Sequence, residues 1–172
     1  MKYYGAISSP KDLVNKEYVD ARHGTFELIE TITLSEAVET VERSAEPDGK
    51  AYGFSDALVM TSFPLTTSGN EMLQNYRVFA LLDGNTKLRV EGFRNVYRNP
   101  YNNDTWTIIE NTHGFFRLTM SQTTSNPAAL DSFPARQSSK GCFGSKITSL
   151  NISAVGAELP VNTVIKIYGV RI

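Results

Sequence analysis

Apolar and polar residues alternate along most of the chain after Gly24, and this alternation predicts a series of short β-strands. Phe26, Leu28, Ile32 and Leu34 share one parity, which Glu30 interrupts, and this indicates a strand with one buried face. Residues 35–43 fit either a short helix or an irregular strand. The alternation returns in the segments 52–60, 76–82, 88–90, 106–109, 116–120, 147–152 and 161–172. The pattern therefore predicts about eight strands.

Turn-forming residues separate these segments and favour antiparallel pairing. Glu46-Pro47-Asp48-Gly49 is typical of a tight turn, and Asp83-Gly84-Asn85 lies between two alternating segments, as in a β-hairpin. A second hairpin is expected around Thr112-His113-Gly114. We therefore predict an all-β fold, an antiparallel, jelly-roll-like β-sandwich that spans residues 24–172.

Residues 1–23 have a different pattern and form a separate predicted segment. Ser9 can cap a helix, with Pro10 at its first position and Asp12 in its first turn. A helix of about a dozen residues is marginally stable alone in water. We expect it to dock on the chain's own domain or on a neighbouring copy. Its apolar stripe supplies the candidate docking residues Leu13, Val14, Tyr18 and Val19.

Two predicted connections are long. One runs from Asn95 to Asp104, and the other runs from Ser121 to Gly141. The second is longer than the structureless loops that are usual in compact domains. We therefore expect it to be functional, mobile, or partly helical between Pro127 and Phe133.

Composition and charge exclude several classes of protein. The net charge is −1, from 17 basic and 18 acidic residues, so no strong field attracts nucleic acid or anionic lipid. The single cysteine, Cys142, cannot form an intrachain disulfide, and its apolar neighbours favour a buried structural thiol. The N-terminus has no signal-peptide pattern, and no apolar run is long enough to span a bilayer. We expect the chain to be made as a soluble product in a cytoplasm.

The sequence carries no strong catalytic signature. The two histidines, His23 and His113, lack a second ligand at metal-binding spacing, and no phosphate-binding loop or nucleophile elbow occurs. Glu91 and Glu110 fall on predicted strands, where acidic residues are usually ordinary surface groups. We therefore predict that the chain is not an enzyme and uses no cofactor or metal.

One polar and aromatic cluster could bind a glycan. Aromatic faces stack on sugar C–H groups, while planar amides, carboxylates and guanidinium groups pair with neighbouring hydroxyls. The alternative is purely structural, because Asn-Pro and Asn-Asn form turns, and Trp106 alternates with Ile108 as core residues do. The candidate ligand-binding residues are Tyr97, Arg98, Asn99, Tyr101, Asn102, Asn103 and Asp104.

Three segments resemble parts of bacteriophage virion appendage proteins. Asn15-Lys16-Glu17-Tyr18-Val19-Asp20, preceded by Ser9-Pro10 and Asp12, resembles the Asn-Lys-x-Tyr-Val-Asp linker of tail fibres, which commonly sits at trimeric joints. Ile165–Val170 is similar to the closing strand of β-sandwich head domains in tail and baseplate proteins, and Glu46–Lys50 fits the same module. The chain lacks the coiled-coil or repeat shaft of long fibres.

The resemblance implies a homotrimeric virion module, placed as a fibre, short spike, capsid decoration, head fibre or baseplate component, that contributes to host attachment. Its expected partners are its own copies and other capsid or tail proteins, with a host-surface glycan as a candidate ligand. No contact with nucleic acid and no membrane insertion are expected. The alternatives are a free-standing bacterial carbohydrate-binding module and a β-sandwich hydrolase.

Overall fold

The computed structural model describes residues 25–67, 71–98, 104–112, 115–122, 131–134 and 144–171, and this part of the chain is all-β. Its ten strands pair in antiparallel fashion throughout. They are β1 (Glu27–Thr33), β2 (Thr40–Arg43), β3 (Phe54–Ser62), β4 (Glu71–Leu82), β5 (Asn85–Arg98), β6 (Asp104–Thr112), β7 (Phe115–Gln122), β8 (Asp131–Pro134), β9 (Ile147–Ala154) and β10 (Val164–Arg171).

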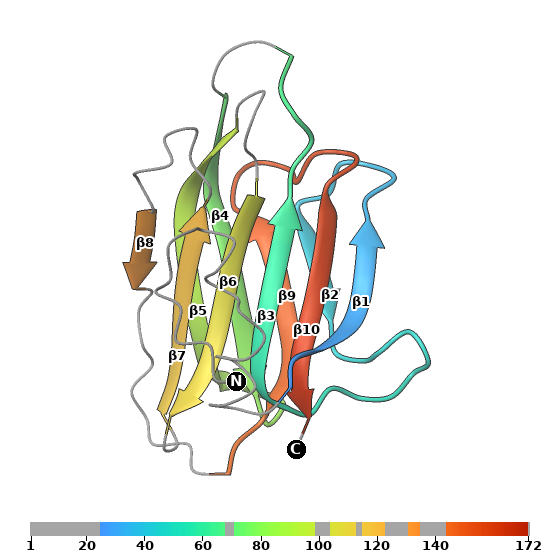
Figure 1. Cartoon of the computed structure of the whole chain (residues 1–172), viewed down its shortest axis with the longest axis vertical. Coiled ribbons are helices and arrows are strands. Elements are labelled where there is room, and N and C mark those ends of the chain that lie inside the picture. Colours follow the sequence, from blue (N-terminus) through green and yellow to red (C-terminus); the bar gives the residue numbers. More distant parts are fainter. Residues whose placement is uncertain are drawn as a thin grey trace, which may run out of the picture.

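The strands form two groups. One runs in the order β1-β10-β3-β6-β7-β8, and the other in the order β2-β9-β4-β5. A single backbone pair, Phe54 with Ile147, joins β3 to β9 and makes one continuous sheet of the two groups. In Figure 1 the second group lies behind the first. The pairing between the described strands does not close into a barrel.

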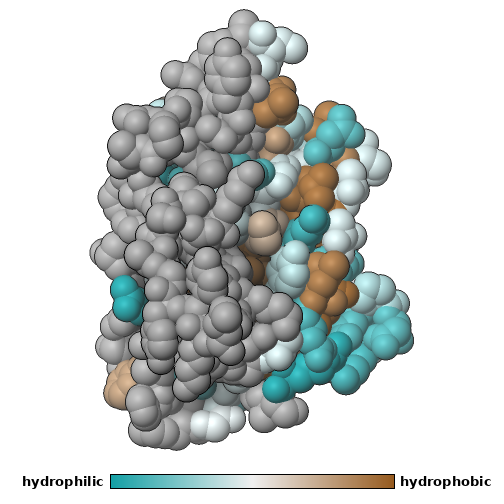
Figure 2. Space-filling view, in the orientation of Figure 1, coloured by the Kyte–Doolittle hydropathy of each residue, from teal (hydrophilic) through white to brown (hydrophobic). Residues whose placement is uncertain are grey.

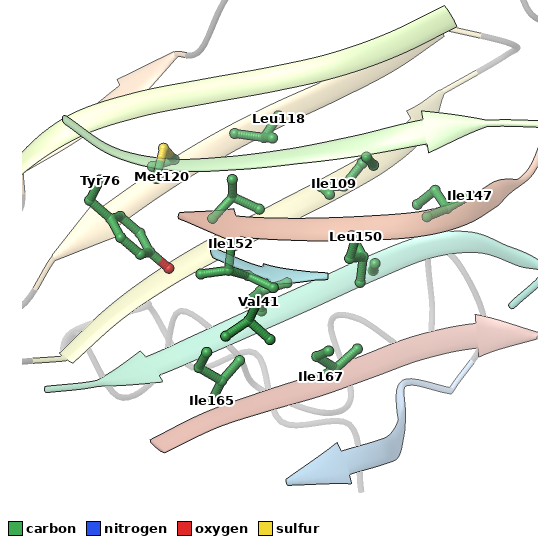
Figure 3. Packing of buried hydrophobic residues seen from close by; sticks show 14 of the residues in the cluster. Val41, Tyr76, Ile109, Leu118, Met120, Ile147, Leu150, Ile152, Ile165 and Ile167 are labelled. Atoms are coloured by element: carbon green, nitrogen blue, oxygen red, sulfur yellow. The ribbon is translucent and has the colours of Figure 1, made fainter. Parts of the chain in front are cut away.

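One hydrophobic core lies between the two groups and draws side chains from both. Ile109, Leu118, Ile165 and Ile167 come from the first group, and Leu150, Ile152 and Val78 come from the second; all seven are buried. Figure 3 shows several of these side chains meeting between the ribbons. Each buried aliphatic side chain of this size stabilises the fold by about 1.5–3 kcal/mol. This shared core holds the two groups together.

Local sequence determines the turns, as predicted. In the turn after Glu46, the backbone N–H of Gly49 donates to the Glu46 carbonyl (2.9 Å), and Gly49 has a φ of +88°. Asp83 and Gly84, with φ values of +53° and +66°, connect β4 to β5 in the expected hairpin. The second hairpin is confirmed as well, because Thr112 pairs with Phe115.

Two short strands correct the predicted element list. The segment 35–43 was left open between helix and strand, and its last residues form strand β2 beside β9. The connection from Ser121 to Gly141 was expected to be functional, mobile, or partly helical between Pro127 and Phe133; of the last segment, the described residues belong to strand β8, which pairs with β7. Both strands have four residues. Too few side chains alternate in such a strand to reveal it without its partner.

The prediction of which strand residues face the core is wrong at two places. Trp106 and Ile108 were expected in the core, but they are half-buried on the opposite face of β6, and Thr105, Thr107 and Ile109 are the buried residues instead. Both faces of this inner strand are partly apolar. On β1, an irregularity between Leu28 and Glu30 shifts the register and leaves Leu28 54% exposed.

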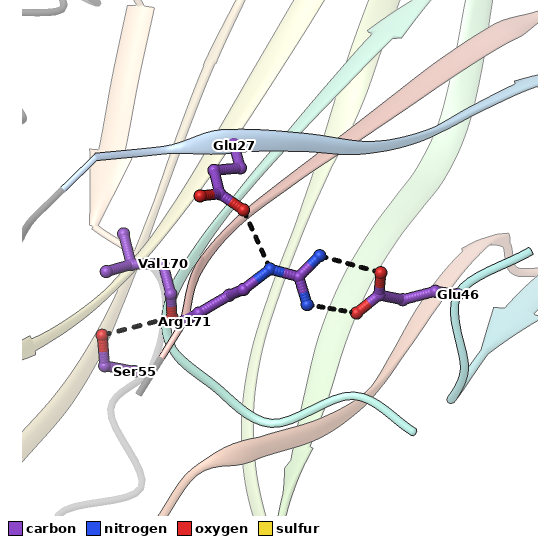
Figure 4. A network of polar contacts seen from close by, with 5 residues as sticks. All are labelled: Glu27, Glu46, Ser55, Val170 and Arg171. Atoms are coloured by element: carbon purple, nitrogen blue, oxygen red, sulfur yellow. Dashed lines mark hydrogen bonds and ion pairs between the residues drawn. The ribbon is translucent and has the colours of Figure 1, made fainter. Parts of the chain in front are cut away.

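Ion pairs add to the backbone bonds and connect some elements, such as β1 and β2, that backbone bonds do not join. Nε of Arg43 on β2 donates to both carboxylate oxygens of Glu30 on β1, at 3.1 and 3.2 Å. Figure 4 shows Arg171 between Glu27 and Glu46, with 2.8 Å from its Nε to Glu27 and 2.8 Å from its Nη2 to Glu46. The hydrogen bonds from Arg171 lower the pKa of Glu46. These contacts hold the 46–50 turn, the hydrophilic lobe at the lower right of Figure 2, against the end of β10.

A buried tyrosine makes the stability of the fold sensitive to alkali. The hydroxyl of Tyr76 lies 2.8 Å from Oγ1 of Thr61, and burial raises the pKa of Tyr76 to about 12. An unfolded tyrosine titrates near pH 10. Between these values the unfolded chain releases a proton that the folded chain retains, so the stability decreases as the pH rises.

The titration of Tyr76 should lower the free energy of unfolding by up to about 1.4 kcal/mol for each pH unit in this range. We expect Tyr76→Phe to remove this contribution. Burial also raises the pKa of Tyr52, so part of the dependence will persist in the variant. Urea unfolding at pH 8, 10 and 11 measures both slopes. Identical slopes for the wild type and Tyr76→Phe would contradict the prediction, whatever the loss of the Thr61 bond costs at neutral pH.

Candidate functional site

The outward face of the β4–β5 hairpin carries a group of aromatic and charged side chains. The alternation along each strand directs Val78, Ala80 and Val90 into the core, so the intervening residues point away from it. The antiparallel register places Arg77 opposite Phe93 and Phe79 opposite Glu91. We call these residues, together with Arg89, the β4–β5 face; they are Arg77, Phe79, Arg89, Glu91 and Phe93.

Electrostatic contacts hold the polar members of this face in place. A guanidinium N–H of Arg77 donates to Glu91, and Nη2 of Arg89 lies 3.5 Å from the other carboxylate oxygen. The Arg77 guanidinium also lies over the Phe79 ring, 5.1 Å from its centroid, and that of Arg89 lies 5.9 Å from the same centroid. Cation–π contacts of this kind contribute about 0.5–1 kcal/mol at exposed sites. The face is therefore ordered before any ligand arrives.

A shallow, open depression of about 340 Å³ lies on this face, lined by Asn75, Arg77, Glu91, Phe93 and Val155. Phe93 is 64% exposed. The backbone below is fixed, because the N–H of Asn75 donates to Oδ1 of Asn95 (3.2 Å) and its carbonyl accepts from the N–H of Val155 (3.2 Å). The depression combines an exposed aromatic face with planar hydrogen-bonding groups.

The predicted glycan cluster falls partly on described residues. Tyr97 is 53% exposed and points outward at the end of β5, on the same side as Phe93. Arg98 points the other way, where its Nη2 donates to the Pro64 carbonyl (3.2 Å) and its Nη1 lies 3.5 Å from Glu71. Asp104 begins β6 opposite Ser62 and is half-buried. The structure thus places Tyr97 and Arg98 on opposite faces.

The remaining predicted residues lie outside the described part of the chain. These are Asn99, Tyr101, Asn102 and Asn103 of the glycan cluster and Leu13, Val14, Tyr18 and Val19 of the docking stripe, and Cys142 is outside it as well. Ligand binding by the first group and docking by the second stay predictions.

A glutamine side chain supports the end of β5 that carries Tyr97. Gln122 on β7 is buried, its amide Nε2 donates to the Tyr97 carbonyl, and its Oε1 accepts from the Tyr97 N–H (3.2 Å). The side chain therefore makes the two hydrogen bonds that a neighbouring strand would make. It links β7 of the first strand group to β5 of the second.

Sequence reasoning missed the β4–β5 face, although a signal for it was present. Once Tyr76, Val78, Ala80 and Leu82 are assigned to the core, Phe79 occupies the outward parity of a hairpin strand, and Phe93 does so on the return strand. Aromatic residues at outward positions on both strands of one hairpin indicate an exposed apolar site.

Two other features are absent from the described ranges. They contain no group of three or more His, Cys, Asp or Glu side chains arranged to hold a metal ion. The same residues include no helix of the length and apolarity needed to cross a bilayer. Comparison of the chain with models of known protein families and with curated protein sequences finds no match.

Proposed function

We propose that the chain is a non-catalytic structural module of a bacteriophage virion that contributes to attachment to the host surface. In this proposal the strands form a jelly-roll-like β-sandwich, residues 1–23 join the copies into a homotrimer or dock them on capsid or tail proteins, and the opposite end of the domain faces outward. The resemblance of Asn15–Asp20 to the appendage linker suggests the setting.

One observation carries the proposal: the strand that follows the N-terminal segment begins at the end of the domain opposite Tyr97, Arg98 and Asp104, the described members of the predicted glycan cluster. Glu27, the first residue of β1, pairs with Gly169 near the end of β10, which lies at the bottom of Figure 1. At the other end, Arg98 pairs with Glu71, and Asp104 pairs with Ser62. A module anchored through residues 1–23 can therefore present the Tyr97–Asp104 end to its surroundings.

The sandwich part of the proposal is supported by the two strand groups and their shared core. Backbone pairing connects the groups at Phe54 and Ile147, and the Gln122 side chain connects them again at Tyr97. Arg98 adds a third link through the Pro64 carbonyl. The Arg43–Glu30 ion pair and the Tyr76–Thr61 hydrogen bond also cross between the groups. A domain tied at several places can transmit force between its two ends without separating into its two groups.

Trimerisation would strengthen weak attachment. When copies are joined, the second and third binding events become intramolecular and gain from a high effective concentration. Each site can then bind feebly while the assembly binds well. This suits a shallow, open site such as the depression on the β4–β5 face.

Light scattering of the purified full-length chain tests the oligomer. We expect a mass three times that of the 19.1 kDa chain. The double variant Leu13→Glu/Tyr18→Glu should give monomers, because it places charges on the apolar stripe. The control His23→Glu also adds a negative charge to residues 1–23, but it lies off that stripe and outside the Asn15–Asp20 linker, so it should stay trimeric. A monomeric wild-type protein would instead favour the free-standing carbohydrate-binding module.

A further inference from the structure

We propose that the depression on the β4–β5 face binds an uncharged saccharide, with Phe93 as the stacking platform and Arg77, Glu91 and Asn75 as hydrogen-bonding partners of its hydroxyl groups. The proposal rests on the adhesive part of the proposed function, since it names the ligand class. It is independent of the virion setting and of the trimer, which the light-scattering experiment tests separately.

The aromatic part of the argument begins with exposure. Phe93 is the most exposed of the large hydrophobic side chains among the described residues, at 64%. Its electron-rich ring face can receive the polarised C–H groups of a sugar ring. Tyr97 lies four residues further along β5 on the same face, at roughly 13 Å for an extended strand. The two rings therefore form a platform along which an oligosaccharide can extend.

The polar part of the argument concerns the groups beside Phe93. Arg77 has five N–H donors and Glu91 has several lone pairs, and the ion pairs of the β4–β5 face use only some of them. The unused donors and acceptors can pair with hydroxyl groups, each of which both donates and accepts. Because Glu91 already contacts Arg77 and Arg89, binding requires little additional ordering of these long side chains.

Charge balance favours an uncharged ligand. Arg89 lies outside the lining of the depression, in which the one cation, Arg77, pairs with the one carboxylate, Glu91, so the lining has no net charge. An anionic sugar would have to approach that carboxylate. The volume of about 340 Å³ is at the small end of the range for ligand sites. It suits a few sugar units held at an open surface better than an enclosed cofactor.

A printed array provides the first test: it carries neutral glycans built from glucose, galactose, mannose and N-acetylhexosamines beside acidic glycans that contain sialic or uronic acids, and it is incubated with the full-length protein. We expect a set of neutral oligosaccharides to bind, and the strongest of them can be titrated by calorimetry. Phe93→Ala should weaken that binding about tenfold or more, because it removes the stacking face. Its melting temperature should stay unchanged, since the side chain is mostly in solvent.

Phe115→Ala is the matched control. Phe115 is 51% exposed but belongs to β7, in the other strand group. Its removal should leave the affinity unchanged. Failure of every neutral glycan to bind, binding confined to acidic glycans, or equal affinity of Phe93→Ala and the wild type would each overturn the inference. None of these results would alter the expected mass of the oligomer, so the two proposals can fail separately.

Discussion

Replacing Gly169 with alanine should lower the free energy of unfolding by about 3 kcal/mol, although it adds only one methyl group. A Cβ at this position would lie 2.5 Å from Cδ1 and 2.7 Å from Cγ of Phe54. The Phe54 ring is buried, and the Tyr52 ring packs beside it with 4.8 Å between centroids. The ring therefore cannot move aside without disturbing the core. Urea unfolding monitored by circular dichroism measures the loss.

Two further variants identify the cause. Gly53→Ala is the control, because a Cβ there would meet nothing nearer than 3.6 Å, and its effect should be small. Phe54→Ala removes the clashing ring atoms, so Gly169→Ala should cost at least about 1 kcal/mol less in the Phe54→Ala background. If the losses of unfolding free energy of the two single variants simply add in the double variant, the clash with Phe54 is not the cause of the destabilisation by Gly169→Ala.

The second large effect is expected at Gln122. Gln122→Met keeps the length of the side chain and removes both hydrogen bonds to the Tyr97 backbone. Leaving a backbone donor and an acceptor without these partners should destabilise the protein by about 2–4 kcal/mol. Hydrogen exchange should also speed up most at the end of β5, because the link between β5 and β7 is lost. Urea unfolding and amide exchange provide the two measurements.

Gln122→Glu gives a control with a distinct signature. Its carboxylate can still accept from the Tyr97 N–H, but it faces the Tyr97 carbonyl without a proton to donate. Burial favours the protonated acid, so the pKa of this carboxyl should be raised in the folded state. The penalty should therefore be largest at neutral pH and should shrink as the pH falls. If the loss of unfolding free energy in Gln122→Glu does not change with pH, the Gln122 side chain does not connect β7 to the Tyr97 backbone in the way described.

Local signals predicted a large part of this fold. The Glu46–Gly49 and Asp83–Asn85 turns depend on neighbouring residues and were found where expected. β2 and β8 could not be predicted, because four-residue strands are defined by partners far along the chain. Trp106 was placed on the wrong face because β6 carries apolar residues on both sides, so the alternation does not say which face is buried.

The candidate site was harder to predict than the strands. Tyr97 was identified from its sequence neighbourhood, but Phe93, Arg77 and Glu91 become one site only through the pairing of β4 with β5. Asn75, with a φ of +53°, lies where the β4–β5 register shifts, and no sequence pattern revealed that shift. Sites built across strands depend on register, which the alternation within one strand does not determine.

The margins of the two strand groups differ in how each resists lateral aggregation. β2 and β8 have four residues each, which gives an incoming chain little backbone to pair with. β1 is irregular near Leu28 and carries the charge of Glu30 in its ion pair with Arg43. On β5, the backbone of Tyr97 already bonds to Gln122. Such a domain can therefore stay at high concentration without its sheets fusing into fibrils.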